Sequence, residues 1–313
     1  MMSAFHSRLY GDPTDAARIV EFVRRVRPRE RVTDYPGIVD LPDVLTPVSA
    51  TTRLWFAADD QIVGVAFVDA FQTLRFELDW QRIAPDLEAA VIAWGDGCIR
   101  RASGASSDSL RIYAAAHEAD AARLRFLARH AFTRLADSII HMERPLIDPL
   151  PAPRLPPGFQ IRAVAGLHEA AALAALHRAA FGTPHMSAAR RLTMMQAAHY
   201  DPALDLVAIA PDGTPAAYGM GSVSSEENAL TGRNDSYADL FATLPAYRGK
   251  GLAQALMLTI LQKLRARGLA TAKLSTASNN SAMQRVASSA GFKAISATVR
   301  LQRAIAVEPP AVG

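Results

Sequence analysis

Apolar residues in this 313-residue chain follow two spacings, one typical of strands and one of helices. Over 236–244 a run with aromatic and β-branched residues has a strand-like pattern and ends at Pro245. Beyond position 251, apolar residues recur at helical spacing and basic residues gather before Gly268, which would serve as the C-cap. The pattern predicts a strand, a turn rich in glycine and a helix in direct succession.

The same reading predicts similar elements before and after a proline-rich stretch over 145–158. Before it, we expect a strand over 8–10, a helix opened by Asp12-Pro13, a long loop over 33–47, strands over 54–57, 62–68 and 74–78, a helix over 86–101, a strand over 110–114, a helix over 121–130 and a strand over 138–144. After it, we expect a strand over 159–164, helices over 168–181 and 187–199, a hairpin over 204–210 and 215–223, the strand and helix described above, and a strand over 272–276.

The two parts repeat one order of elements, and residues 121–132 align with residues 281–292. Five prolines between 149 and 157 stiffen the chain and forbid helix, which is typical of a linker. The sequence thus predicts a domain over 1–148, a linker over 149–157, a second domain over 158–303 and a tail over 304–313.

The turn between the predicted strand and helix reads Tyr247-Arg-Gly-Lys-Gly-Leu-Ala253. Such a turn directs free backbone N–H groups and the positive end of the helix dipole at one small volume, which favours an anion. A nucleotide P-loop requires Ser or Thr after the lysine, and a dinucleotide fingerprint requires a third glycine, so this turn matches neither. The first half has no glycine at the corresponding place, 78–86, and its copy is expected to be degenerate.

The pattern Arg-x-x-Gly-x-Ala between strand and helix resembles the pyrophosphate loop of the GNAT superfamily of N-acetyltransferases. Downstream, the positions of Asn280, Met283 and Gly291-Phe292 are similar to the second helix and Gly-Phe ending of that family. The resemblance implies an α+β fold of two GNAT-like domains, each a mixed, mostly antiparallel sheet flanked by helices. It also implies an acyltransferase that moves an acetyl group from acetyl-CoA, as co-substrate, to the amine of a small molecule.

Carried onto this sequence, the family pattern places the pantetheine along the strand before the motif, the pyrophosphate on the loop and one contact on the second helix. The implied cofactor-binding residues are Phe241, Ala242, Thr243, Leu244, Arg248, Gly249, Lys250, Gly251, Leu252, Ala253 and Asn280. The acceptor cleft should be lined by residues 182–186 and 224–228, where Glu226 and Glu227 could hold a cationic amine.

The sequence departs from the family at the catalytic positions. The usual general-acid tyrosine falls on Ala287, which cannot donate a proton, so Tyr237, Tyr247 or water must do so, or the thiolate leaves unassisted. The usual glutamate base falls on Tyr237, but Asp239 shares its strand face. Asp235 is a close rival as the base, and both carboxylates could instead be solvated or ion-paired.

Composition and residue spacing bear on the possible partners, metals and location of the protein. A net charge of +4, without a run rich in both basic and aromatic residues, does not suggest nucleic acid. The single cysteine, Cys98, fits a reducing cytoplasm, and no stretch is long and apolar enough to span a membrane. The histidines show no metal spacing, so no metal is expected, and a homodimer is left open. A catalytically silent acyl-CoA-binding sensor or partner-binding module stands as the alternative to an enzyme, since Ala287 favours it.

Overall fold

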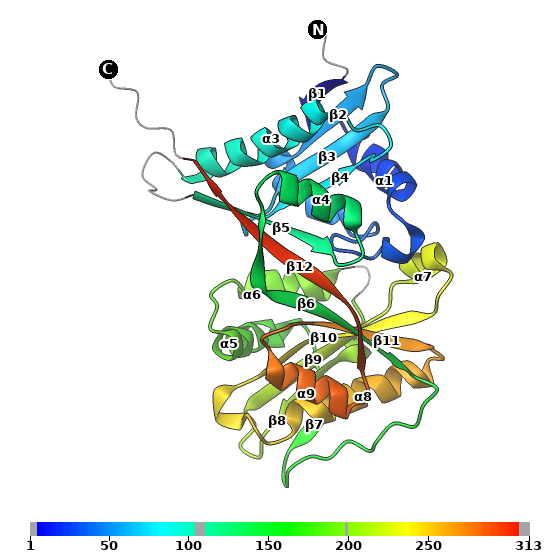
Figure 1. The fold of residues 1–313 in the computed structure, drawn as a ribbon. Helices are drawn as coiled ribbons and strands as arrows, with labels where there is room; N and C mark the ends of the chain where they lie inside the picture. The colour runs from blue at the N-terminus through cyan, green and yellow to red at the C-terminus, as the bar shows by residue number, and fades with distance from the viewer. Residues whose placement is uncertain (1–4, 104–109, 198–199, 307–313) are drawn as a thin grey trace. The chain divides into compact units, whose positions relative to one another are not determined.

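The protein was analysed as a computed structural model that describes residues 5–103, 110–197 and 200–306 (Figure 1). Contacts divide the chain into two compact units. Unit 1 contains Met1–Ile139, Ala229–Thr231 and Ala297–Gly313, and unit 2 contains Ile140–Asn228 and Gly232–Ser296. The domain bounds expected from the sequence, 1–148 and 158–303, stay a prediction.

Unit 1 is built on an antiparallel sheet of order β1-β2-β3-β4. Its elements, with the strand that leads into unit 2, are β1 (Phe5–Leu9), α1 (Asp15–Val26), α2 (Leu41–Leu45), β2 (Arg53–Ala57), β3 (Ile62–Val68), β4 (Leu74–Leu78), α3 (Pro85–Ser103), β5 (Leu110–His117), α4 (Ala121–Arg129) and β6 (Thr133–Pro145). Every residue of β3 is buried, because α1 and α2 pack on one face of the sheet and α3 packs on the other. This explains why β3 reads as a continuous apolar run rather than an alternating one.

Unit 2 contains the glycine-rich turn. The elements from the proline-rich stretch onward are β7 (Gln160–Ala163), α5 (Ala170–Phe181), α6 (Ala188–Gln196), β8 (Asp205–Ile209), β9 (Pro215–Ser222), α7 (Ser225–Thr231), β10 (Asp235–Thr243), α8 (Leu252–Ala266), β11 (Thr271–Ala277), α9 (Ser281–Ser289) and β12 (Lys293–Ile305).

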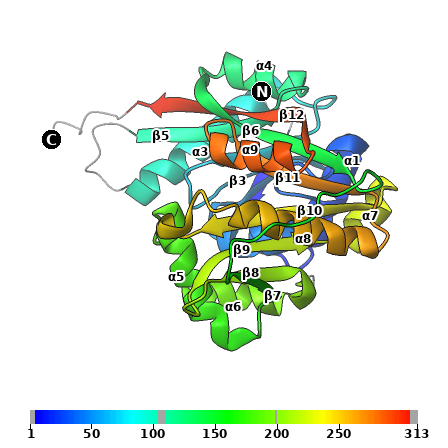
Figure 2. The ribbon, with the colours of Figure 1, turned by 90° about the horizontal axis from the view of Figure 1, so that it is seen from below.

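Helices cover both faces of the unit 2 strands (Figure 2). On β9, Tyr218 packs in the cluster of α5 and α6, whereas a Cβ at the next residue, Gly219, would lie 3.4 Å from Ile260 of α8. Successive residues thus face opposite sides, as the pleat of a strand requires. The face under α5 and α6 is called the α5 face below.

A second sheet has the order β5-β12-β6-β11-β10-β9-β8-β7. Among the pairs with a recorded register, only β10 and β11 run parallel. β6 and β12, the long green and red strands in Figure 1, each have residues in both units. The expected α+β fold class, with mixed and mostly antiparallel sheets between helices, is confirmed.

Three local expectations were wrong, and one helix was not predicted. Helix α1 begins at Asp15 after the N-cap Thr14, because Asp12 accepts hydrogen bonds from the backbone N–H and hydroxyl of Thr14 in the turn before it. The loop expected over 33–47 contains α2, which Pro42 helps to start. Residues 224–228, for which no element was predicted, open helix α7, whose N-cap Ser224 accepts from the N–H of Glu227. The helix expected to reach position 199 ends at Gln196, and His199 lies outside the described residues.

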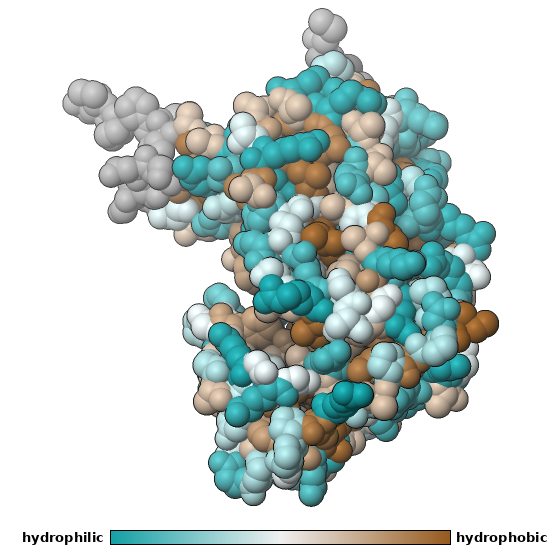
Figure 3. Space-filling model, turned by 60° about the horizontal axis from the view of Figure 1, so that its bottom comes forward, coloured by the Kyte–Doolittle hydropathy of each residue, from teal (hydrophilic) through white to brown (hydrophobic). Residues whose placement is uncertain are grey.

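The face displayed in Figure 3 mixes hydrophilic residues with scattered hydrophobic ones. Within the described ranges, no helix combines the length and apolar character needed to cross a membrane.

Candidate functional site

The loop before α8 has the backbone of an anion site. Gly249 and Gly251 have φ values of 75° and 79°, in the left-handed region that favours glycine. No atom lies within 4 Å of the place where a Cβ would stand on either residue, so the loop is open there. Gly251 is the N-cap of the 15-residue helix α8 and gives it no side-chain cap, which leaves the first-turn N–H groups available to a ligand. This combination fits a phosphate or pyrophosphate.

The two cations of the loop differ in their surroundings. Arg248 and Lys250 are both exposed, which suits binding of a charged ligand from solvent. The Nη2 of Arg248 also donates to the main-chain oxygen of Ala180, at 2.7 Å. Arg248 therefore contacts the C-terminal end of α5 as well as bringing charge to the loop.

Strand β10 leads into this loop and separates from its neighbour β11. The two pair only over Asp235–Tyr237 and Thr271–Lys273, although each strand continues further. On its other edge, β10 pairs with β9, with a shift of register between Asp239 and Ala242. Leu240, inside that bulge, has φ of 54°. The open edge beyond Tyr237 offers main-chain groups to an extended ligand, which is the arrangement expected for residues 241–244.

Phe241 and Leu244 contact the neighbouring strand β9. The Phe241 ring packs against Gly219, where an added Cβ would lie 2.5 Å from a ring carbon, on the side of α8. Leu244 donates its N–H to Ala216. The Phe241 ring therefore lies on the opposite side of the sheet from the α5 face.

Asp239 lies at the bulge on the α5 face. Its partner in register on β9 is Met220, which packs in the cluster under α5 and α6. Burial raises the pKa of the Asp239 carboxyl to about 6. A carboxylate with that pKa is ionised at neutral pH and can still accept a proton, which suits a general base.

Asp235, the rival carboxylate, is held in ion pairs. Its side chain is 2% exposed, and its Oδ2 lies 2.6 Å from Nζ of Lys273 and 2.7 Å from Nε of Arg233. Both cations contact the same carboxylate oxygen, so the Asp235 side chain is held in ion pairs within unit 2. The contacts favour Asp239 over Asp235 as the base.

Tyr237 lies between these two carboxylates along the strand. Its hydroxyl donates to Glu227, and the Lys273 ammonium lies 5.8 Å from the centre of its ring. Burial, with the neighbouring carboxylates, raises the pKa of the Tyr237 phenol, so it stays protonated at neutral pH. Glu227 is thus bound within unit 2, whereas Glu226 in the same helix turn is exposed.

The two positions singled out near the second helix differ in character. Asn280 is the N-cap of α9 and accepts from the N–H of Met283, at 3.1 Å. Ala287 is fully buried in the core beneath α8 and α9. A tyrosine there would need space that the core does not hold, so the sequence difference is matched by the packing. Tyr247 is the remaining tyrosine proposed as an acid, and its hydroxyl lies 3.5 Å from Asp212 Oδ2.

A buried polar cluster that was not predicted from the sequence lies beside Asp239. Asp205 on β8 and Asp239 on β10 both pair in register with Met220. Arg191 of α6 bonds to Asp205, and its Nη1 lies 2.8 Å from the sulfur of Met220. Tyr200 also donates to Asp205, at 2.7 Å.

One signal could have revealed this cluster. Arg191 and Met195 stand four apart on α6 and are both buried, so the arginine occupies the apolar stripe of that helix. His177 of α5 faces the same cluster of side chains, with its Nδ1 2.6 Å from the hydroxyl of the buried Tyr218. Burial lowers the pKa of His177, and the charges of Arg190 and Arg191 lower it further.

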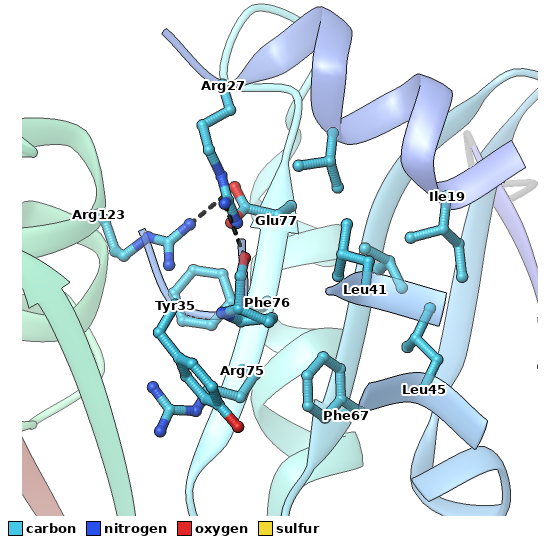
Figure 4. A pocket seen from close by; sticks show the side chains of 13 residues that line it. Ile19, Arg27, Tyr35, Leu41, Leu45, Phe67, Arg75, Phe76, Glu77 and Arg123 are labelled. Carbon is cyan, nitrogen blue, oxygen red and sulfur yellow. Dashed lines mark hydrogen bonds and ion pairs between the residues drawn. The ribbon is translucent and has the colours of Figure 1, made fainter. Parts of the chain in front are cut away.

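In unit 1, a small pocket lies between α1, α2 and β4 (Figure 4). Glu77 lies between Arg27 and Arg123, with N–O distances of 2.5 Å and 2.8 Å. These two cations outweigh burial and lower the pKa of Glu77. Apolar side chains line most of the rest of the pocket. The cavity volume is ≈ 20 Å³, little more than the roughly 10–15 Å³ that one water needs.

The residues that the structure describes include no group of three or more His, Cys, Asp and Glu side chains that could hold a metal ion. Cys98 is a buried free thiol, and burial raises its pKa.

Comparisons with known proteins agree with this geometry. Residues 170–292 match the family model "Acetyltransferase (GNAT) family". A GCN5-related N-acetyltransferase from Sphaerobacter thermophilus is similar in structure over 97% of this chain and 96% of its own, with 21% identity and a TM-score of 0.74. A tandem GNAT protein from the clavulanic acid biosynthesis pathway is similar over 97% of this chain and 99% of its own, with 17% identity and a TM-score of 0.70. The search of curated proteins gave no match.

Proposed function

We propose that this protein transfers an acetyl group from acetyl-CoA to the amine of a small molecule, because residues 170–292 match the model of the acetyltransferase (GNAT) family. One observation carries the proposal: the open glycine loop before α8 stands at the end of a strand whose bulge holds Asp239, a carboxylate with a raised pKa. An anion site and a base on one strand are what acyl transfer from a phosphorylated donor to an amine requires.

The cofactor-binding proposal assigns a role to each part of the loop and strand. Main-chain N–H groups from Arg248 to Ala253 would hold the pyrophosphate, with charge from Arg248 and Lys250. The edge of β10 over 241–244 would hold the extended pantetheine. Asn280 belongs to this proposal as a residue near the cofactor, although its side chain also caps α9. Acetyl-CoA would supply the activated acyl group.

Asp239 would take the proton that an ammonium acceptor must lose before it can act as a nucleophile. The free amine then forms the N–C bond with the acyl carbon as the C–S bond breaks and the CoA thiolate leaves. The nitrogen loses its second proton to solvent water to give the neutral amide. With a pKa of about 6, Asp239 is mostly ionised at pH 7, so the base is in its active form under ordinary conditions.

Tyr237 is the residue we propose to reprotonate the thiolate. Its phenol keeps its proton at neutral pH and shares a strand face with Asp239. Ala287 cannot perform this step. Tyr247, whose hydroxyl lies 3.5 Å from Asp212 Oδ2, and water are the alternative donors.

The acceptor is proposed to be a small-molecule amine that approaches the α5 face near residues 182–186. Glu226 is exposed and would be available to a cationic amine, whereas Glu227 is already bonded to Tyr237. We therefore give Glu226 the direct contact and Glu227 an indirect one through the Tyr237 hydroxyl.

A silent acyl-CoA-binding module is the second candidate, and the buried Ala287 is the observation that favours it. A cytoplasmic location is also proposed, on the strength of the single cysteine and its buried thiol.

Thiol release from acetyl-CoA, measured over a panel of small primary amines, tests the enzyme proposal. We expect release that depends on one amine class and saturates with acetyl-CoA. CoA binding by calorimetry without release for any amine would favour the silent module. An absence of CoA binding would overturn both candidates.

A further inference from the structure

The contact between Arg248 and Ala180 joins the glycine loop to the end of α5. Ala180 is the penultimate residue of that helix, where main-chain oxygens lack partners inside the helix. A guanidinium is well suited to this place, because it donates to the free oxygen and its charge complements the negative end of the helix dipole. The 2.7 Å bond therefore satisfies a group that the helix itself leaves open.

Residues 182–186 follow directly and are tied back to the same helix. The N–H of Gly182 bonds to the oxygen of Arg178 at 2.9 Å, in a left-handed cap with φ of 63°. The Nη1 of Arg178 then donates to the oxygen of Met186, at 2.7 Å. One end of this segment is fixed at Gly182 and the other at Met186, both through Arg178.

We propose that Arg248 is a positioning residue that links the filling of the glycine loop to the order of residues 182–186. The inference rests on the proposed function, in which the loop holds the pyrophosphate of CoA and this segment lines the acceptor cleft. It adds a coupling between the two sites that neither site requires by itself.

The proposed coupling depends on the number of N–H donors that the rigid guanidinium of Arg248 carries. A guanidinium has five N–H donors, and the bond to Ala180 uses one nitrogen, so the others can reach a phosphate oxygen at the same time. A phosphate that fixes the guanidinium also fixes the end of α5, and through Arg178 the segment beyond it. Lys250 is a single charged point on a flexible stem and cannot bridge in this way.

Hydrogen exchange, read by mass spectrometry on the full chain, tests the coupling with CoA as the only ligand. In the parent protein, saturating CoA should slow exchange of the Thr183, His185 and Met186 amides by about five- to tenfold, the low end of usual couplings. In Arg248→Ala at saturating CoA, these amides should exchange at the ligand-free rate. Lys250→Ala is the matched control, which should bind CoA more weakly yet keep the protection at saturation.

A second variant keeps the test decisive if Arg248→Ala loses too much affinity to be saturated. Arg178→Ala removes the hydrogen bond from Arg178 to the main-chain oxygen of Met186 and leaves the glycine loop unchanged. CoA affinity should therefore stay within about twofold of the parent value, while protection of residues 182–186 falls. Arg248→Lys should recover affinity but only part of the protection.

The failures of the two proposals differ. If the parent binds CoA and the three amides exchange at the same rate with and without it, the coupling is overturned and the proposed function stands. Equal protection in the parent and Arg248→Ala would overturn Arg248 as the link. If the parent binds no CoA, the proposed function falls and the coupling falls with it.

Discussion

Asp239→Asn should make the protein more stable at neutral pH and less active. The carboxyl has a pKa of about 6 in the folded protein, whereas an aspartate in an unfolded chain has a pKa of about 3.8, so folding opposes its ionisation. This difference in pKa corresponds to about 3 kcal/mol. An amide of similar shape never carries this charge and avoids the cost.

The sign and pH window follow from the raised pKa. Below about pH 3.8 the carboxyl is protonated in both states, and the parent has no disadvantage. The cost builds as pH rises from 3.8 to 6 and is constant above that range. At pH 5 the variant should be more stable by about 1–2 kcal/mol, and at pH 7.5 by about 3 kcal/mol, as an upper value.

Urea unfolding of parent and variant at pH 5 and pH 7.5 measures both differences. Asp212→Asn is the control, because backbone bonds to Thr214 lower the pKa of that exposed carboxyl and its loss should not stabilise the fold. A stability difference for Asp239→Asn that is the same at both pH values would refute the reasoning, since it would show a carboxyl that ionises as freely as in the unfolded chain.

Three further outcomes are expected. Arg248→Ala combined with Gly251→Val should weaken CoA binding strongly in titration calorimetry. The first change removes a charge, and the second adds about 1–3 kcal/mol of strain at a left-handed position. Unchanged affinity would mean that the loop is not the pyrophosphate site. Native mass spectrometry should find one CoA per chain, because the turn before α3 lacks the glycines of its counterpart, and two equivalent sites would overturn the degenerate first copy. Tyr237→Phe should lower turnover by about a hundredfold or more at unchanged CoA affinity if the phenol reprotonates the thiolate, whereas unchanged turnover would leave water as the donor.

Much of the fold could be predicted because its elements carry their own local signals. Helix α8 has apolar residues at helical spacing and a glycine after its last turn, and both features depend only on neighbours in sequence. The start of α1 was missed by two residues, because Asp12 forms a polar turn before the helix instead of capping it. The short helix α7 was missed because it has no buried residue to set a pattern.

The site was accessible from sequence only where its chemistry follows from the backbone. Glycines between a strand and a helix are typical of an anion-binding loop. The distance of Asp239 from this loop along the sequence places it on the preceding strand. Sequence could not decide between Asp239 and Asp235, because the ion pairs of Asp235 depend on Lys273, which a separate strand brings beside it. The buried pair of Arg191 and Asp205 was missed for the same reason, since its members lie on different elements and meet only in the fold.

The bond between Arg248 and Ala180 also lay beyond the sequence, which assigned the arginine only to the phosphate. A helix end offers its free oxygens to any donor that the fold brings near, and spacing along the chain does not show which donor that will be.

The most direct test of the enzyme proposal is the turnover of Asp239→Asn with an amine that the parent protein acetylates, measured beside its affinity for CoA. The account predicts a loss of about a hundred- to ten-thousandfold in the rate of amine-dependent thiol release at pH 7.5, with CoA affinity unchanged. Asp235→Asn, measured in parallel, should keep more of the parent rate. Parent-like turnover of Asp239→Asn would contradict the account and leave water, or another group, as the base.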